Sequence, residues 1–356
     1  MECLTKCVAD FKLEQWLKNN TTVKHKEYET KSRPGSKPCV LRCAAASMRG
    51  NYPEKEEGYG NQDSYTVEEI EEGVLAGVFD GHGEYGDDCA EFVRDEIGDV
   101  LSDKHKEFVD WSDALSETYQ TLNKKSHKEK DFDDLLSGTT AVTAYFGEGA
   151  IWFANVGDSR AVLGKVDQGG SFSTTPLFVD QTPFRQDERE RVRAAGAQVM
   201  SYGQRMKGAK EPDSQYWEER ADAMGADADA GTYKLVGGEP RVWAPGKEMP
   251  GTAFTRSIGD KYGEKVGVIG EPEVLRYELK EGDRFVFMCS DGVHDFITSQ
   301  RVLNMIIEAG ALNPDAPPET ALAACRAVVA EAYRLWMTHD IRSDDITIVL
   351  VIIDPQ

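Results

Sequence analysis

The residues of this chain best suited to chemistry are aspartates that lie beside apolar, strand-like runs. Asp80, Asp291 and Asp344 each adjoin such a run, and Asp158 lies in a short glycine-containing turn between two of them. Any one of these positions is explained by turn formation, because Asp-Gly is a favoured turn dipeptide and aspartate often ends a strand. Four of them together suggest more, since a sheet aligns the ends of its neighbouring strands.

A cluster of carboxylates at one end of a sheet requires a cation, because ionised carboxylates repel one another in a small volume. Oxygen donors with no nearby cysteine and little histidine favour Mg²⁺ or Mn²⁺ over Zn²⁺. Two such ions about 3.5–4 Å apart are suited to an in-line displacement at phosphorus. His82, two residues after Asp80, is placed to protonate the departing oxygen; on position alone, a structural histidine is the competing interpretation. His294 lies in the loop between Asp291 and Asp295.

The elements that must position these residues are short strands mixed with longer helices. Strands are expected at 74–79, 139–146, 151–155, 160–163, 284–289 and 346–353, and helices at 1–20, 86–102, 108–126, 186–196, 299–309 and 318–338. Connections such as 147–149 and 157–159 are too short for parallel crossovers, so they predict antiparallel hairpins. Antiparallel strands with helices between groups of them predict a layered α+β domain.

Two segments differ from this pattern. Residues 18–42 carry seven Lys or Arg against two Glu, and Pro34, Gly35 and Pro38 interrupt regular structure. We expect an arm along the acidic body, with binding of an acidic partner as the alternative. Residues 201–248 are rich in Gly, Ala and charge with weak periodicity, which predicts a surface insertion in one domain.

Composition excludes several classes of function. The 356 residues include 41 Lys and Arg against 63 Asp and Glu, a net charge of −22 that argues against nucleic-acid or anionic-membrane binding. The longest apolar run, 346–353, is far shorter than the roughly 20 residues of a membrane helix. Seven cysteines without a Cys-x-x-Cys pair indicate neither a disulfide framework nor a zinc ribbon. We therefore expect a soluble protein without a membrane span, cytoplasmic or nuclear and not secreted.

An ordered series of segments carries a family resemblance across about residues 43–354. These segments are Asn61–Ser64, Val78–Gly83, Ser137–Ala141, Ala154–Arg160, Glu188–Val192, Arg241–Trp243, Thr255–Asp260, Cys289–Gly292 and Ser343–Thr347. The chain resembles the metal-dependent Ser/Thr protein phosphatases of type 2C. The resemblance implies a central sandwich of two antiparallel sheets flanked by helices. It divides the chain into an N-terminal helix and basic arm (1–42) and a catalytic domain (43–356), with a flap at about 201–240.

The resemblance also assigns roles at the site. Asp80 would bridge two Mg²⁺ or Mn²⁺ ions, and Asp291 and Asp344 would complete the protein ligands of the first ion. The Gly81 carbonyl would bind the second ion. His82 matches the general acid that protonates the leaving group.

A weaker third metal site is implied at Asp158 and Asp295, together with Asp291. Gln62 and Asp63 are the remaining candidates for the metal site, at the position of the family's Glu-Asp pair. Here Gln62 replaces the glutamate that helps to hold the second ion, which lowers the charge of the ligand set by one. Gln62 retains a carbonyl oxygen that could act directly or through water.

Two further departures concern neighbouring positions. Asp345 stands where many members have Asn, and we expect it to lie behind the ligands. The insertion 51–60 blurs the position of the phosphate-binding arginine, and the position five residues before Asp63 is Gly58. Arg49 and Lys55 are the candidates, with Lys offering a point charge where Arg offers a fork.

The sequence thus predicts a Mg²⁺- or Mn²⁺-dependent phosphatase that acts on phosphoserine and phosphothreonine in proteins, by direct attack of a metal-bound hydroxide. A monomer is the family default. A pseudophosphatase scaffold is the alternative, which retention of Asp80, Asp291, Asp344 and His82 disfavours. A metal-dependent phosphodiesterase or nuclease is disfavoured by the net charge, and nucleotide binding by the absence of a P-loop.

Overall fold

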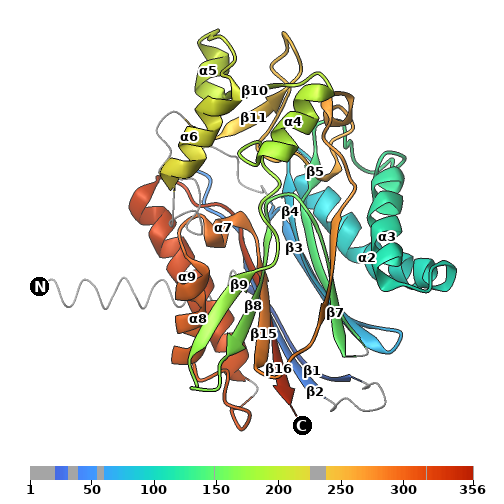
Figure 1. Cartoon of the computed structure of the whole chain (residues 1–356), viewed down its shortest axis with the longest axis vertical. Coiled ribbons are helices and arrows are strands. Elements are labelled where there is room, and N and C mark those ends of the chain that lie inside the picture. The colour runs from blue at the N-terminus through green and yellow to red at the C-terminus, as the bar shows by residue number, and fades with distance from the viewer. Residues whose placement is uncertain are drawn as a thin grey trace, which may run out of the picture.

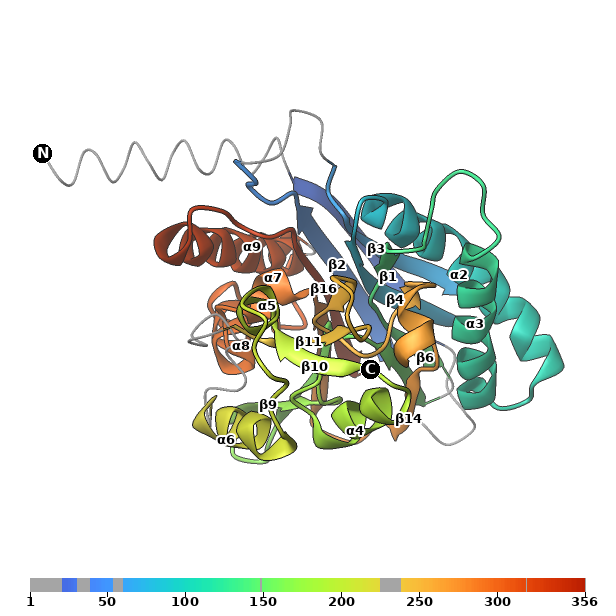
Figure 2. The ribbon, with the colours of Figure 1, turned by 90° about the horizontal axis from the view of Figure 1, so that it is seen from above.

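The computed structural model describes residues 21–30, 39–53, 60–147, 149–224, 238–317 and 319–355. The helix expected over 1–20 and the candidate Lys55 lie outside these ranges. Two antiparallel sheets face each other at the centre, with one helical layer on each outer side (Figures 1 and 2). The predicted sandwich with flanking helices is therefore confirmed.

The first sheet has six strands in the order β1-β2-β16-β15-β8-β9. Their bounds are β1 Thr21–Thr30, β2 Cys39–Met48, β8 Arg160–Val166, β9 Phe172–Pro176, β15 Asp283–Cys289 and β16 Ile346–Pro355. Helices α8 (Ser299–Glu308) and α9 (Glu319–His339) cover its outer face, and the short α7 (Asp291–His294) follows β15.

The second sheet has seven strands, in the order β13-β5-β4-β6-β7-β14 with β3 also paired to β4. Their bounds are β3 Asp63–Ile70, β4 Gly73–His82, β5 Gly138–Thr139, β6 Ala141–Gly147, β7 Ala150–Val156, β13 Ile258–Gly259 and β14 Glu273–Glu278. Helices α2 (Gly86–Glu107) and α3 (Trp111–Ser126) cover its outer face. No helix among the described residues is long and apolar enough to cross a membrane.

Strand β16 shows why its sequence is an almost unbroken apolar run. Because side chains alternate along a strand, Val349 and Val351 pack between the two sheets, whereas Ile348 and Leu350 pack under α8 and α9. Both faces are buried, so neither can be polar. This central strand carries the segment that begins at Ser343 to the end of the sandwich.

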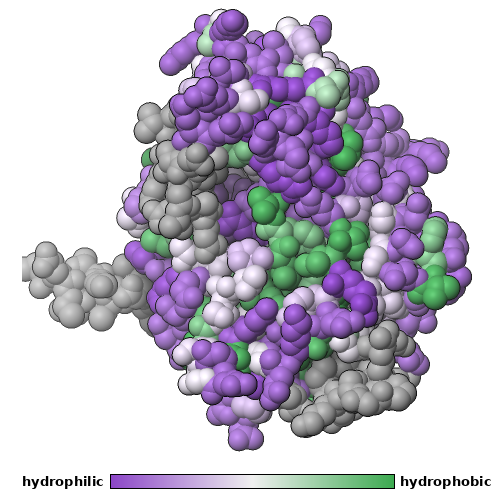
Figure 3. Space-filling view, viewed as in Figure 1, coloured by the Kyte–Doolittle hydropathy of each residue, from purple (hydrophilic) through white to green (hydrophobic). Residues whose placement is uncertain are grey.

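A third, small sheet forms from β10 (Gln198–Ser201), β11 (Pro240–Trp243) and β12 (Pro250–Thr252). Around it lie α4 (Gln186–Ala194), α5 (Tyr202–Met206), α6 (Ser214–Met224) and the 3-10 turn η2 (Gly263–Val266). Its outer face is mostly hydrophilic in Figure 3, as expected for a surface insertion. However, the insertion has a core of its own, in which Trp217 is fully buried with Val192 and Val242.

Two expectations differ from the structure. Strands β7 and β8 do not form the hairpin expected across 157–159: β7 pairs with β6 and β14, whereas β8 pairs with β15 and β9. The turn at Gly157, with φ +100°, instead passes the chain from one sheet to the other. In addition, residues 21–30 form β1, paired along β2, and β2 runs through the domain boundary expected at residue 42.

Candidate active site

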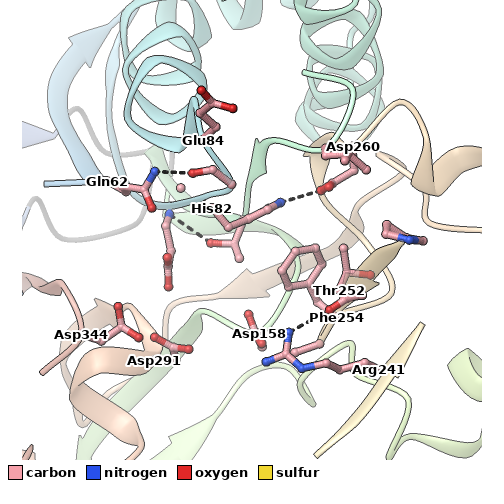
Figure 4. A pocket seen from close by; sticks show the side chains of 18 of the residues that line it. Gln62, His82, Glu84, Asp158, Arg241, Thr252, Phe254, Asp260, Asp291 and Asp344 are labelled. Atoms are coloured by element: carbon pink, nitrogen blue, oxygen red, sulfur yellow. Dashed lines mark hydrogen bonds and ion pairs between the residues drawn. The ribbon is translucent and has the colours of Figure 1, made fainter. Parts of the chain in front are cut away.

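Four aspartates from four separate connections meet in one pocket of about 600 Å³ at the end of the sandwich (Figure 4). Asp80 lies near the end of β4, Asp158 between β7 and β8, Asp291 at the start of α7, and Asp344 just before β16. Gln62, Gly81, His82 and Thr140 line the same pocket. The convergence expected from strand ends is therefore confirmed.

Local hydrogen bonds fix Asp80 in place. Its backbone N–H donates to Oγ1 of Thr140 at 3.1 Å, and the backbone N–H of Thr140 donates to the carbonyl of Asp80 at 2.9 Å. The hydroxyl of Thr140 also contacts that of Ser159 at 2.7 Å, beside Asp158. The segment Ser137–Ala141 thus ties two of the aspartate-bearing connections together.

The carboxylates of the pocket destabilise one another's charge. Burial, followed by repulsion from neighbouring aspartates, raises the pKa values of Asp80 and Asp291 well above the usual range. Burial and the nearby Asp180 raise the pKa of Asp158 to about 7. Such a site gains from a cation, which offsets the repulsion and favours the ionised forms.

The donor set suits a hard, partly hydrated divalent ion. Among the described residues, no three His, Cys, Asp or Glu side chains are arranged to enclose a metal by themselves. Carboxylate and carbonyl oxygens are the donors that Mg²⁺ and Mn²⁺ prefer, and waters can complete the coordination of either ion. The residues therefore fit Mg²⁺ or Mn²⁺ with water completing the coordination, and not a closed zinc site.

His82 faces the aspartates from the other side of the pocket (Figure 4). Its Nε2 lies 2.6 Å from Oδ2 of Asp260, a residue that is 1% exposed. The imidazole ring also packs on Phe254, with ring centroids 4.4 Å apart. The placement expected for His82 beside the carboxylate cluster is thus observed, whereas Asp260 had appeared only as the last residue of a matching segment.

Comparison with known proteins accounts for this arrangement. The family model for protein phosphatase 2C matches residues 54–340. The chain belongs to the protein phosphatase 2C family. It is 39% identical over 309 residues to Probable protein phosphatase 2C 35 of Arabidopsis thaliana, covering 86% of this chain and 82% of that protein.

More distant relatives agree on the family and the fold. Probable protein phosphatase 2C 64 of Oryza sativa subsp. japonica is 31% identical over 307 residues, covering 84% of this chain and 61% of that protein. The crystal structure of serine-threonine phosphatase 2C from Toxoplasma gondii superposes with a TM-score of 0.65 at 17% identity, covering 92% of this chain and 99% of that one. That similarity supports the phosphatase 2C fold.

The residues at which this phosphatase 2C chain departs from the family pattern have definite places. Nε2 of Gln62 donates to the carbonyl of Gly83 at 2.7 Å, which ties Gln62 to the loop that follows β4. Asp345 accepts hydrogen bonds from the backbone N–H groups of Gly50 and Gln62, at 2.6 and 2.7 Å. Asp345 therefore lies behind the pocket and orders its loops, as expected.

Asp63 is also behind the pocket. Its Oδ2 accepts from the hydroxyl of Ser290 at 2.7 Å, while its buried Oδ1 has no hydrogen-bond partner among the described residues. Burial, with repulsion from Asp345, raises the pKa of Asp63 well above its usual range. Tyr52, which had given no signal in the sequence, lines the pocket and donates to Oδ1 of Asp344 at 2.5 Å.

Asp295 lines a second, adjoining pocket of about 180 Å³ that shares Asp158, Asp291 and Asp344 with the first. The three aspartates that the resemblance assigned to a weaker third ion thus line one cavity. His294 lines it too, and its Nε2 lies 3.0 Å from the backbone carbonyl of Asp158. Burial lowers the pKa of His294 to about 3, so the ring is neutral and holds the turn around Asp158.

The candidates for phosphate binding were not brought to the pocket. Arg49 is described but does not line either pocket, and Lys55 lies outside the described residues. Arg241 is the one Lys or Arg among the described residues that line the larger pocket. It donates to the carbonyl of Gly251 at 2.8 Å and pairs with Glu239. Its membership of the matching segment Arg241–Trp243 was the only sequence signal for it.

Proposed function

We propose that this protein is a Mg²⁺- or Mn²⁺-dependent protein serine/threonine phosphatase. The observation that carries the proposal is the convergence of Asp80, Asp158, Asp291 and Asp344 in one pocket, with His82 on its opposite side. Membership of the protein phosphatase 2C family supports the same reaction class. Its substrates would be phosphoproteins.

The residues of the pocket would have two roles, metal binding and proton donation. Asp80, Asp291, Asp344 and the Gly81 carbonyl would hold two divalent ions, and Asp158 with Asp295 would serve a third. When bound, the ions supply an activated water and offset the charge of the phosphoryl group. His82 protonates the departing serine or threonine oxygen, which is a poor leaving group without a proton.

The rest of the pocket shapes how a substrate is bound. Arg241 offers the phosphate a guanidinium that can form paired, charge-assisted hydrogen bonds. Leu136, Phe254 and Pro250 provide an apolar side to the same pocket.

A covalent cysteine mechanism receives no support from the described residues. Cys43, Cys89, Cys289 and Cys325 are all buried, and burial raises the pKa of the Cys325 thiol to about 12. A thiol with so high a pKa remains protonated near neutral pH and is a poor nucleophile, because the thiolate is the reactive form. Direct attack by water on phosphorus is therefore the proposed route.

The test is hydrolysis of p-nitrophenyl phosphate and a phosphothreonine peptide, titrated with Mn²⁺ and Mg²⁺ and quenched with EDTA. We expect metal-restored turnover by the wild type and none by Asp80→Asn. The matched control is Asp283→Asn, which neutralises a buried aspartate at the far end of β15 and should retain activity. Absence of turnover in folded wild-type protein would overturn the proposal and leave the scaffold alternative.

A further inference from the structure

We propose that Asp260 is the positioning residue that fixes the orientation and tautomer of His82, the proposed general acid. The inference rests on the proposed function, because it explains how His82 acts as the general acid. Asp260 itself touches neither substrate nor metal in this assignment.

The two ring nitrogens of His82 have different surroundings. Nε2 lies 2.6 Å from Oδ2 of Asp260, whereas Nδ1 is buried with no hydrogen-bond partner among the described residues. A carboxylate acceptor places a proton on the nitrogen that faces it, because a deprotonated ring nitrogen would meet its lone pairs. Asp260 therefore holds the ring through Nε2 at the edge of the pocket, which His82 lines.

Asp260 is itself held firmly. Its Oδ2 also accepts from the hydroxyl of Ser257 at 2.6 Å, and its backbone N–H donates to the carbonyl of Ser137 at 2.9 Å. Its φ of +47° is in the left-handed region, which is uncommon outside glycine although aspartate tolerates it better than most residues. Backbone conformations of this kind are kept where the surrounding structure requires them, often at functional sites.

The neighbouring residues leave space for this pair and for little else. A Cβ at Gly138 would lie 2.7 Å from Oδ2 of Asp260 and 3.0 Å from Nε2 of His82, so a side chain there would collide with both. Phe254 packs on the imidazole ring and limits its rotation. Gly138, in the segment Ser137–Ala141, therefore leaves room for the contact between His82 and Asp260.

The proton balance of the step follows from this geometry. Water adds to phosphorus as the bond from phosphorus to the substrate oxygen breaks, and the electron pair of that bond goes to the departing oxygen. That oxygen takes a proton from the imidazole of His82, which the contact with Asp260 holds in place. The proton lost by the attacking water returns through solvent to His82, so the cycle consumes one water and releases an alcohol and phosphate.

The test is a double-mutant cycle with His82→Ala, Asp260→Asn and the double variant. Asparagine keeps the size of aspartate and tolerates a positive φ, so it changes mainly the charge. We expect Asp260→Asn to lower kcat on a phosphothreonine peptide about 10–100-fold, less than loss of a general acid, and to leave p-nitrophenyl phosphate within about 3-fold. The double variant should be no slower than His82→Ala alone.

Several readouts separate positioning from a merely structural role. KM for the peptide and the Mn²⁺ concentration for half-activation should stay near wild type in Asp260→Asn, and Asp283→Asn should change neither substrate's kcat. In ¹⁵N spectra, the His82 ring of the wild type should carry its proton on Nε2, and Asp260→Asn should weaken that preference. Ser257→Ala, a milder change, should shift the peptide rate in the same direction by less.

The outcomes distinguish the two proposals. If His82→Ala slows both substrates equally, the acid role of His82 fails and the proposed mechanism fails with it. If His82→Ala slows the peptide much more than p-nitrophenyl phosphate but Asp260→Asn does not, only the assignment of Asp260 is overturned. The same holds if the two rate losses multiply in the double variant. A wild-type His82 protonated on Nδ1 instead of Nε2 would overturn it as well.

Discussion

Replacing Asp158 with asparagine should stabilise the protein when divalent ions are chelated, although it alters the active-site pocket. Asp158 lines both pockets, and burial and Asp180 raise the pKa of its carboxyl to about 7. Ionising that carboxyl in the folded protein is therefore unfavourable unless a cation compensates it. Asparagine has almost the same shape and no charge, so it removes this cost.

The magnitude follows from the difference between folded and unfolded pKa. The pKa rises from 3.8 to about 7, and each unit corresponds to about 1.4 kcal/mol, which gives a ceiling of about 4 kcal/mol. Water in the open pocket and local relaxation reduce this cost, so we expect about 1–2 kcal/mol. Below about pH 4 the carboxyl is protonated in both states and costs nothing; between about pH 4 and 7 only the unfolded state loses its proton, so wild-type stability falls as pH rises.

The assay is urea unfolding in EDTA at about pH 4 and about pH 8, repeated with excess Mn²⁺. In EDTA, the unfolding free energy of Asp158→Asn should exceed that of the wild type by about 1–2 kcal/mol at the higher pH and equal it at the lower pH. With excess Mn²⁺ the difference in unfolding free energy between the variant and the wild type should shrink or change sign, because ion binding stabilises the wild type more. The control Asp283→Asn weakens contacts with Tyr277 and the Lys280 N–H, and should lose stability under all conditions. A variant less stable than wild type in EDTA near pH 8 would refute the reasoning.

Three further predictions test other parts of the site. Arg241→Met should raise KM for a phosphopeptide about 10-fold with a smaller change in kcat, measured by steady-state kinetics, since it removes a charge-assisted contact to phosphate. His127→Gln should lower the unfolding free energy by about 1–2 kcal/mol at neutral pH, because the contact with Asp134 raises the pKa of His127 to about 9; the loss should be full below about pH 6.5 and fade as pH rises through about 9. Gln62→Glu should lower the Mn²⁺ concentration for half-activation, yet destabilise the protein in EDTA, because a carboxylate would face the carbonyl of Gly83.

The sequence could predict the aspartate cluster because strand ends are local features and sheets align them. The apolar run of β16 and the run before Asp80 predicted buried strands, and the carboxylates at their ends converge in the structure. The sequence could not predict how β7 and β8 divide between sheets. The connection at 157–159 is short enough for a hairpin, and the choice depends on the strands that each one meets, β14 and β15 among them.

Long-range contacts account for the other differences. Asp260 meets His82 across 178 positions of sequence, and neither residue's local pattern signals the other. Trp217 follows Tyr216 in an otherwise charged, weakly periodic segment, so only the fold shows that it forms a core with residues of α4 and β11. Arg241, and not Arg49, is the cation at the pocket because it lies on β11 of the small third sheet, whose position the spacing from Asp63 does not determine.

The charge of the pocket bears on how such a protein binds phosphate at all. A phosphate dianion must enter a site lined by several carboxylates, where Arg241 is the only Lys or Arg among the described residues and is already paired with Glu239. Protein groups alone would repel it, so we infer that divalent ions act in substrate binding as well as in catalysis. An arginine five residues before Asp63, where Gly58 stands in the sequence, would then be less necessary, because the ions proposed to bind the aspartates would supply most of the charge that attracts the phosphate.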